Sequence, residues 1–162
     1  MTASLQNKVT PGGLISPDKI LIVNGKTDKK TLISRLVKTA CRGFAQLNAD
    51  EVTAQVLKRE EGVGTALETG LAIPHARLEE LDSFSAAMAV LPEPMADEKN
   101  PAAPTRVVFL FLSPGCPVFF KQHLQLLAAL AGTFPAAFVE ELAQLADPVQ
   151  IAQKINQKNM VK

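Results

Sequence analysis

The sequence predicts an α/β protein, with a single domain in which a mixed β-sheet is flanked by helices on both faces. Apolar stripes with helical spacing and short apolar runs typical of strands both occur, without a strict βαβ rhythm. Residues 106–112 are almost continuously apolar, which indicates a strand buried on both faces. The length of 162 residues fits one domain, and 47% hydrophobic residues can form a sizeable core.

The first strand and helix are expected soon after a polar lead-in. Residues 20–23 are a short β-branched run that ends at an Asn-Gly turn signal. Thr27 or Asp28 then caps a helix whose apolar side chains recur every three or four positions across residues 32–44. This spacing predicts one buried stripe along the helix.

A second helix and a glycine-rich loop come next. Asn48 is the expected cap, Glu51 is its capping-box partner, and the helix runs towards Arg59. Residues 62–70 form a loop with three glycines and two threonines. Residues 71–73 are a short apolar run that stops at a proline.

The second half of the chain predicts two strands and three helices. Residues 84–91 have the pattern of a strand, and residues 92–104 hold four prolines, which predicts a surface loop. The buried strand at residues 106–112 follows. Three helices close the chain, at residues 119–131, after Pro135 and from Pro148 onward, and Asp147 is the expected cap of the last one.

Composition excludes several functions. Seventeen basic and sixteen acidic residues give a net charge of +1, too balanced for binding to duplex nucleic acid. Residues 1–17 are predicted to be a flexible lead-in without the apolar core of a signal peptide, ahead of a domain at residues 18–158. The longest apolar run is too short to cross a bilayer. A cytoplasmic protein without membrane insertion is therefore expected.

Metal and cofactor chemistry is not predicted. Cys41 and Cys116 lie far apart and form no CxxC pair, so two small buried thiols in a reducing compartment are the simplest interpretation, with Cys116 the more exposed. With only two histidines, His75 and His123, a zinc site of three histidines is impossible. Any imidazole chemistry must use one of these two positions.

His75 is the first candidate for chemistry. It follows a proline directly, so the backbone before it is stiff, and the glycine-rich approach lets main-chain N–H groups come close to an anion. A neutral imidazole is a nucleophile near neutral pH, because its unperturbed pKa is about 6.5. On spacing alone, a loop histidine that bonds to backbone remains the commoner explanation.

His123 and two arginines are the other candidates. His123 shares a helix face with apolar residues four positions away, which usually indicates a core histidine, but it lies early in its helix, where an anion is favoured. Arg59 ends a helix just before the glycine loop, and Arg77 lies two residues after His75. Guanidinium groups match phosphate geometry, although each arginine also fits a surface ion pair.

These residues form a pattern that resembles a known family. Arg59-Glu60, Gly64-Thr65 and the run from Gly70 through Pro74-His75 to Arg77 resemble the active-site motif of enzyme IIA domains of the mannitol and fructose class. These domains belong to the bacterial phosphoenolpyruvate-dependent sugar phosphotransferase system, and the nitrogen-related regulatory enzyme IIA is included among them. A second motif, a histidine followed by leucines in a helix, matches the segment that begins at His123.

The resemblance implies roles for these residues. His75 would be the phosphoacceptor, His123 would stabilise the phosphohistidine, and Arg59 would neutralise phosphate charge. Thr65, Gly70 and Arg77 would support the site. The implied activity is that of a phosphotransferase component, which takes a phosphoryl group from phospho-HPr or a similar carrier and passes it to an enzyme IIB or a regulatory target. No metal and no cofactor is implied.

Three functional hypotheses remain open. The first is a phosphoryl carrier, and the second is a regulatory protein whose His75 phosphorylation state controls partner binding without sugar transfer. The third is a scaffold that has lost transfer activity, suggested by Ala66 and Glu68, which stand where the family usually has glycines. Glu68 would disfavour a phosphate if its side chain pointed into the site.

Overall fold

The computed structural model describes residues 9–62, 65–96, 104–145 and 147–160. Within them, the strands are β1 (Ile20–Ile22), β2 (Leu71–Ala72), β3 (His75–Leu78), β4 (Ser85–Met95) and β5 (Thr105–Pro114). The helices are α2 (Pro11–Leu14), α3 (Lys29–Ala40), α4 (Ala49–Gly62), α5 (Phe120–Thr133), α6 (Ala136–Leu145) and α7 (Pro148–Met160), with 3-10 turns η1 (Pro17–Lys19) and η2 (Pro117–Phe119).

The five strands form one mixed sheet. Its order is β1-β4-β5-β2, with β3 also paired to β5. The β4–β5 pair is antiparallel, and every other pair is parallel. Strands β2 and β3 lie in one line beside β5, and Pro74 interrupts them because proline has no N–H to give to the ladder. The mixed sheet that the sequence predicts is confirmed.

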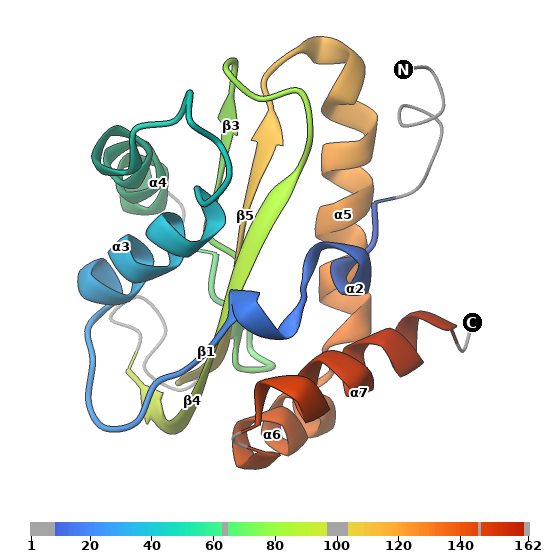
Figure 1. Cartoon of the computed structure of the whole chain (residues 1–162). Helices are drawn as coiled ribbons and strands as arrows, with labels where there is room; N and C mark the ends of the chain where they lie inside the picture. The colour runs from blue at the N-terminus through green and yellow to red at the C-terminus, as the bar shows by residue number, and fades with distance from the viewer. Residues whose placement is uncertain (1–8, 63–64, 97–103, 146, 161–162) are drawn as a thin grey trace.

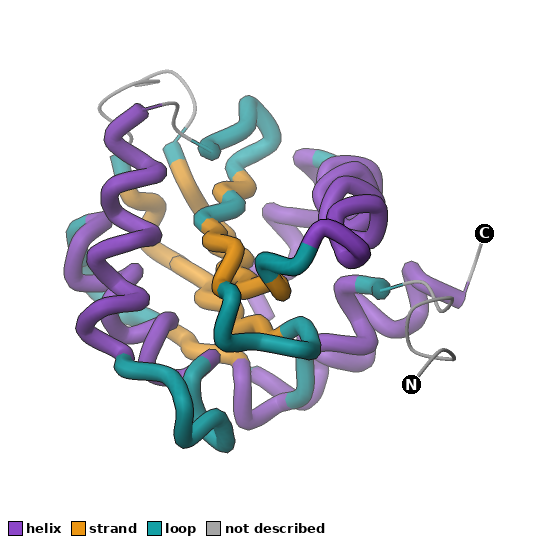
Figure 2. The backbone as a smooth tube through the Cα atoms, turned by 90° about the horizontal axis from the view of Figure 1, so that it is seen from above, coloured by secondary structure: helices purple, strands orange, loops and turns teal. Residues whose placement is uncertain are grey.

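Helices cover both faces of this sheet, as the sequence predicts (Figure 1). Helices α3 and α4 lie over one face, while α5, α6, α7 and the short α2 lie over the other (Figures 1 and 2). Strand β5 is central and serves both layers. Phe109 and Phe111 face the α5–α7 layer, and Leu110 and Leu112 face the α3–α4 layer, as expected from the two-residue period of a strand.

The predicted helix starts are confirmed by their caps. The Asp28 carboxylate accepts the Thr31 N–H at 2.8 Å, and the Asn48 side chain accepts the Glu51 N–H at 3.1 Å. Asp147 does the same for α7, at 3.0 Å from the N–H of Val149. Each cap satisfies a backbone donor that has no partner inside its helix.

Two sequence predictions need correction. Strand β4 continues through Met95, so the prediction of a loop is wrong for residues 92–95, while residues 97–103 lie outside the described part. Pro92 and Pro94 are tolerated because the ladder to β5 is irregular between Val90 and Met95. Strand β3 was also missed, because Pro74 makes its start look like a loop.

The segment at the start of the domain packs more than its composition suggests. Of the predicted lead-in at residues 1–17, only residues 9–17 are described, and they include helix α2. Thr10 caps this helix by accepting the N–H of Gly13 at 3.1 Å, and Ile15 lies in the core with 5% of its surface exposed. The predicted boundary at residue 18 therefore falls after residues that already contact the core.

Thiols, metal clusters and membrane-length helices give three further findings. Cys116 is exposed as predicted, but Cys41 is half-buried, so the expectation of two buried thiols is wrong. In the described ranges, no group of three His, Cys, Asp or Glu side chains is placed to hold a metal ion. No single helix of the described residues is long and apolar enough to cross a membrane. Residues 117–133 and 136–145 reach that length only as a pair, and a bend of 81° separates them.

Candidate functional site

The fold brings the two histidines of the chain together. The ring centroids of His75 and His123 lie 5.3 Å apart, and the ring planes make an angle of 60°. Each residue keeps only 5% of its surface exposed. One imidazole comes from the start of β3 and the other from the first turn of α5, so sequence positions 48 residues apart form one compact site.

The break in the strand at Pro74 positions His75. Its Nδ1 lies 2.7 Å from the carbonyl oxygen of Ile73, two residues earlier. A carbonyl only accepts, so Nδ1 must carry the proton and donate it. The proton on Nδ1 leaves the Nε2 atom of a neutral His75 ring with its lone pair available.

Phe111 forms the floor under both imidazoles. Its ring stacks on His75 at a centroid distance of 5.0 Å and an interplanar angle of 5°. The same ring lies 5.3 Å from the centroid of His123. Phe111 is the cross-strand partner of His75 and is fully buried. Its ring therefore supports both imidazole rings from the centre of the sheet.

A buried hydroxyl holds His123. The Ser113 Oγ lies 2.7 Å from the Nδ1 of His123, and Ser113 is completely buried. Sequence reasoning missed this residue, since serine after an apolar run resembles the end of a strand. The two-residue period of β5 contains the signal, because it places Ser113 on the same face as Phe111.

Burial and charge keep both imidazoles neutral near neutral pH. The pKa of His75 is lowered, mainly because burial disfavours the charged ring and also because the Arg59 guanidinium is close. The pKa of His123 is lowered to about 4, first by burial and then by His75, Arg77 and Arg59. The Arg59 and Arg77 charges thus disfavour a positive charge on the imidazoles, while the Glu60 carboxylate partly opposes this effect at His75.

Arg77 and an apolar rim border the site. The Arg77 guanidinium donates to the carbonyl oxygens of Gly115 at 3.1 Å and Cys116 at 3.4 Å. It also lies 4.9 Å from the centre of the Phe120 ring. Phe120 in turn stacks on His123, with centroids 6.0 Å apart. Val118, Phe120 and Leu124 are exposed, at 54%, 45% and 49% of their surfaces. Large exposed apolar side chains therefore occur in η2 and at the start of α5, and one of them, Phe120, contacts His123.

Thr65 and Gly70 contribute to the structure of the loop that leads into β2. The Thr65 hydroxyl donates to the Glu60 carboxylate at 2.5 Å, and the Thr65 carbonyl accepts the N–H of Ile73 at 3.3 Å. Gly70 has a φ of 94°, which favours glycine, and a Cβ there would lie 3.3 Å from Val139. Glu68 is exposed and is not among the causes of the pKa shifts of either imidazole.

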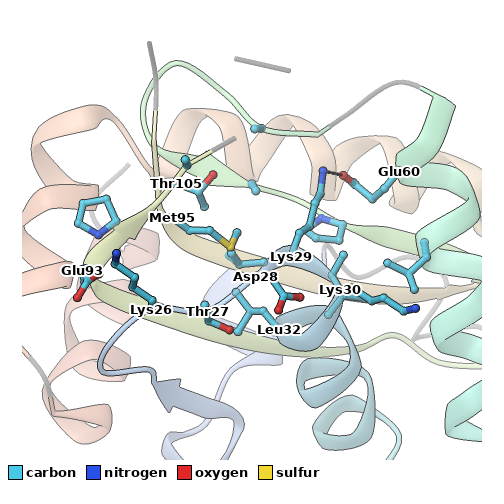
Figure 3. A pocket seen from close by; sticks show the side chains of 18 of the residues that line it. Lys26, Thr27, Asp28, Lys29, Lys30, Leu32, Glu60, Glu93, Met95 and Thr105 are labelled. Carbon is cyan, nitrogen blue, oxygen red and sulfur yellow. Dashed lines mark ion pairs between the residues drawn. The ribbon is translucent and has the colours of Figure 1, made fainter. Parts of the chain in front are cut away.

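The opposite face of the sheet carries a cavity of about 740 Å³ between α3, α4 and the ends of β4 and β5 (Figure 3). Leu32 and Val108 are among the residues that line it. Its charged lining includes an ion pair of 2.7 Å between Lys29 and Glu60 (Figure 3). The Glu60 carboxylate is buried and also accepts from Thr65. This carboxylate is engaged in structural contacts, and its charge also partly opposes the lowering of the His75 pKa.

The sequence also matches known proteins. The family model described as "Phosphoenolpyruvate-dependent sugar phosphotransferase system, EIIA 2" matches residues 14–158. A nitrogen regulatory protein of Pseudomonas aeruginosa is 24% identical over 142 residues, which are 88% of this chain and 91% of the relative. Another, from Bradyrhizobium diazoefficiens, is 33% identical over 119 residues, or 73% of this chain and 75% of that protein.

A solved structure shares the whole fold. The crystal structure of the nitrogen regulatory protein IIA-Ntr from Neisseria meningitidis superimposes with a TM-score of 0.77 at 23% identity. The match covers 89% of this chain and 97% of the Neisseria chain. The arrangement of sheet and helices is therefore common to both proteins.

Proposed function

Because the chain belongs to the EIIA 2 family of the phosphoenolpyruvate-dependent sugar phosphotransferase system, we propose that it is a phosphoryl carrier with His75 as its phosphoacceptor. The observation that carries this proposal is the pair of buried imidazoles, 5.3 Å apart, beside two arginines whose charges act on them. His123 and Arg59 then stabilise the phosphoryl group after transfer.

The nucleophile is the Nε2 atom of His75. Its Nδ1–H remains bonded to the Ile73 carbonyl, so the Nε2 lone pair attacks the phosphorus of a phosphohistidine on the donor. The N–P bond of the donor breaks as the N–P bond to Nε2 forms, and the donor imidazole leaves with the electron pair. Both ends of the reaction are imidazoles, so the transfer is close to reversible and needs no metal or cofactor in its balance.

The lowered pKa of His75 serves this step. A protonated imidazole has no lone pair on Nε2, so burial and the Arg59 charge keep the ring in its reactive form. After transfer, the same cation faces a phosphoryl group with a charge near −2. Phosphoryl transfer depends mainly on positioning and charge stabilisation, and these are the features that surround His75.

The apolar rim supports a protein as the phosphoryl donor. Phe120, Val118 and Leu124 are large exposed apolar side chains of η2 and the start of α5, and the Phe120 ring stacks on His123. Because His75 is 5% exposed, a donor imidazole must come into direct contact with this surface to reach it. An HPr-like carrier is the proposed donor, and an enzyme IIB or a regulatory protein is the proposed acceptor.

The test is phosphorylation in vitro followed by intact-protein mass spectrometry. The wild-type chain, incubated with phosphoenolpyruvate and purified carriers of this system, should gain an acid-labile mass of about 80 Da, one phosphoryl group. His75→Ala should gain none, while His123→Ala should still accept phosphate, more slowly. An adduct that persists undiminished on His75→Ala would refute the assignment of the phosphoacceptor.

A regulatory role is the second candidate, favoured by the two relatives named nitrogen regulatory proteins. In this case the charge on His75 selects the partner, and no sugar receives the phosphoryl group. A pull-down should then recover a protein with the unphosphorylated chain and with His75→Ala, but not with the phosphorylated chain. Identical partners in all three forms would exclude the switch.

A further inference from the structure

We propose that the Ser113 hydroxyl is a positioning group that holds His123 in the tautomer with its proton on Nε2, so that this ring donates to a phosphoryl group on His75. The inference deepens the proposed function and rests on it. It assigns a role to Ser113, which lies outside the motifs of the sequence resemblance. Ser113 is on β5, the strand that pairs with the β3 strand of His75.

The geometry around Ser113 is fixed by the sheet. Ser113 pairs with Arg77 across the β3–β5 ladder. It lies two residues after Phe111, on the same face of β5, and Phe111 stacks on His75. It is completely buried, with its Oγ 2.7 Å from the Nδ1 of His123. A buried hydroxyl needs a hydrogen-bond partner, and the His123 ring supplies it.

The direction of this hydrogen bond decides which nitrogen of His123 carries the proton. In a neutral imidazole one ring nitrogen donates and the other accepts. If Ser113 donates its hydroxyl proton to Nδ1, the ring proton is on Nε2 and can be given to a phosphoryl oxygen. In the other tautomer, the Nε2 lone pair would face the phosphoryl oxygens, which repel it.

The two histidines are then complementary. The Ile73 carbonyl can only accept, so it makes His75 Nε2 a lone-pair nucleophile. In the proposed state the Ser113 hydroxyl donates to Nδ1, which makes His123 Nε2 a donor. One ring forms the N–P bond, and the other stabilises the transferred group, although both residues are of the same type.

A hydroxyl also suits the state after transfer. The phosphoryl charge near −2 favours a protonated His123, whose two nitrogens both donate. The Ser113 hydroxyl can rotate and accept from Nδ1–H in that state, which a fixed donor could not do. Thus the same contact remains satisfied in both charge states of the ring.

The experiment compares Ser113→Ala and Ser113→Thr with wild type, with Ser85→Ala as matched control. Ser85 is also a buried strand serine, with a hydrogen bond of 2.6 Å to the Ala40 carbonyl, but it lies on the α3 side of the sheet. The first readout is the nitrogen NMR spectrum of the unphosphorylated ring, which distinguishes a protonated from an unprotonated Nδ1. The second is the rate of phosphoryl transfer from a purified phosphorylated HPr-like carrier.

We expect an unprotonated His123 Nδ1 in the wild type and in Ser113→Thr, and a mixture of tautomers in Ser113→Ala. Transfer should slow by roughly tenfold in Ser113→Ala, as for loss of one oriented hydrogen bond, and should be retained in Ser85→Ala. Ser113→Cys, a weak donor of similar size, gives an intermediate rate and shows whether an effect in Ser113→Ala is due to packing.

Two results would overturn the inference. One is a wild-type His123 that carries its proton on Nδ1, and the other is a Ser113→Ala variant with unchanged tautomer and unchanged rate. An equal loss of rate in Ser85→Ala would mean that the effect is on stability alone. If the wild type accepts no phosphate while the tautomer still depends on Ser113, the carrier function fails and the hydrogen bond stands.

Discussion

The two faces of the sheet bury polar groups in different ways. On the α3–α4 face, the Glu60 carboxylate is paired with Lys29 at 2.7 Å and accepts from Thr65. On the α5–α7 face, His75 and His123 are buried but neutral, and each has one ring nitrogen held by a hydrogen bond. The Glu60 contacts join α4 to α3 and to the loop at Thr65. The contacts of the two histidines use only Nδ1 of each ring, so they do not engage Nε2.

The difference shows how a buried polar group can be recognised as reactive. A charge that is taken out of water must be paired, so Glu60 is committed to its partners. An imidazole can be buried neutral with only one nitrogen satisfied, at the cost of a lowered pKa. Changes on the α3–α4 face should therefore affect stability first, and changes on the α5–α7 face should affect the histidines first.

The largest stability effect is expected from Lys29→Met. The substitution removes the ammonium partner of a carboxylate that is 4% exposed, so the free energy of unfolding should fall by about 2 kcal/mol or more. Lys154→Met is the control, because its partner Glu141 is 46% exposed. This substitution should lower the free energy of unfolding by less than about 1 kcal/mol. Urea unfolding measures the stability of both variants. Equal losses in Lys29→Met and Lys154→Met would contradict the expected difference between a buried and an exposed ion pair.

Phe111→Leu tests the other face. We expect a loss of about 1 to 2 kcal/mol in unfolding free energy, because a large buried ring is replaced by a smaller side chain. The pKa of His75 should also rise towards its usual value, because water reaches a ring that Phe111 now covers.

Phe109→Leu is the matched control for Phe111. It is on the same strand and face, is fully buried and contacts Phe134 instead of an imidazole. It should cost similar stability without moving the NMR titration of His75. A shift of the same size in both variants would mean that general loosening, not the stacked ring, sets the pKa.

Arg77→Ala should have a smaller effect. It loses the bonds to the Gly115 and Cys116 carbonyls and the contact with Phe120, all at an exposed side chain, so we expect about 0.5 to 1 kcal/mol. The pKa of His123 should rise from about 4, since Arg77 is one of the charges that lower it. Arg35→Ala, on the exposed side of α3, should change neither quantity; a His123 titration that stays in place in Arg77→Ala would remove Arg77 from the site.

At neutral pH the smallest effect is that of His123, because its contribution to stability depends on pH and appears only as the solution becomes acidic. Its folded pKa of about 4 lies below the ordinary 6.5, so between these values the unfolded chain binds the proton first. The ring therefore costs no stability above pH 6.5, and its presence lowers the unfolding free energy progressively as the pH falls towards 4. His123→Gln should lose this component, so the wild type should weaken relative to it below pH 6.5. Parallel curves for the two proteins from pH 7.5 to 4.5 would contradict the burial of the ring.

Local signals predicted much of the fold. The caps Asp28, Asn48 and Asp147 lie where the sequence places them, because capping depends on side-chain oxygens within three residues of the helix start. Strand β5 was recognised from its apolar run. The extension of β4 through Pro92 and Pro94 could not be predicted, since only the irregular pairing with β5 makes prolines acceptable there.

The sequence by itself limited imidazole chemistry to two histidines, and its resemblance to a family motif made His75 the candidate phosphoacceptor. Only the tertiary structure decided the state of that candidate. The floor from Phe111, the neutral rings and the Ser113 contact come from strands and helices that meet in space, far from the motif in sequence. A motif records residue types at short separation, while the pKa and tautomer of a ring depend on whatever packs around it.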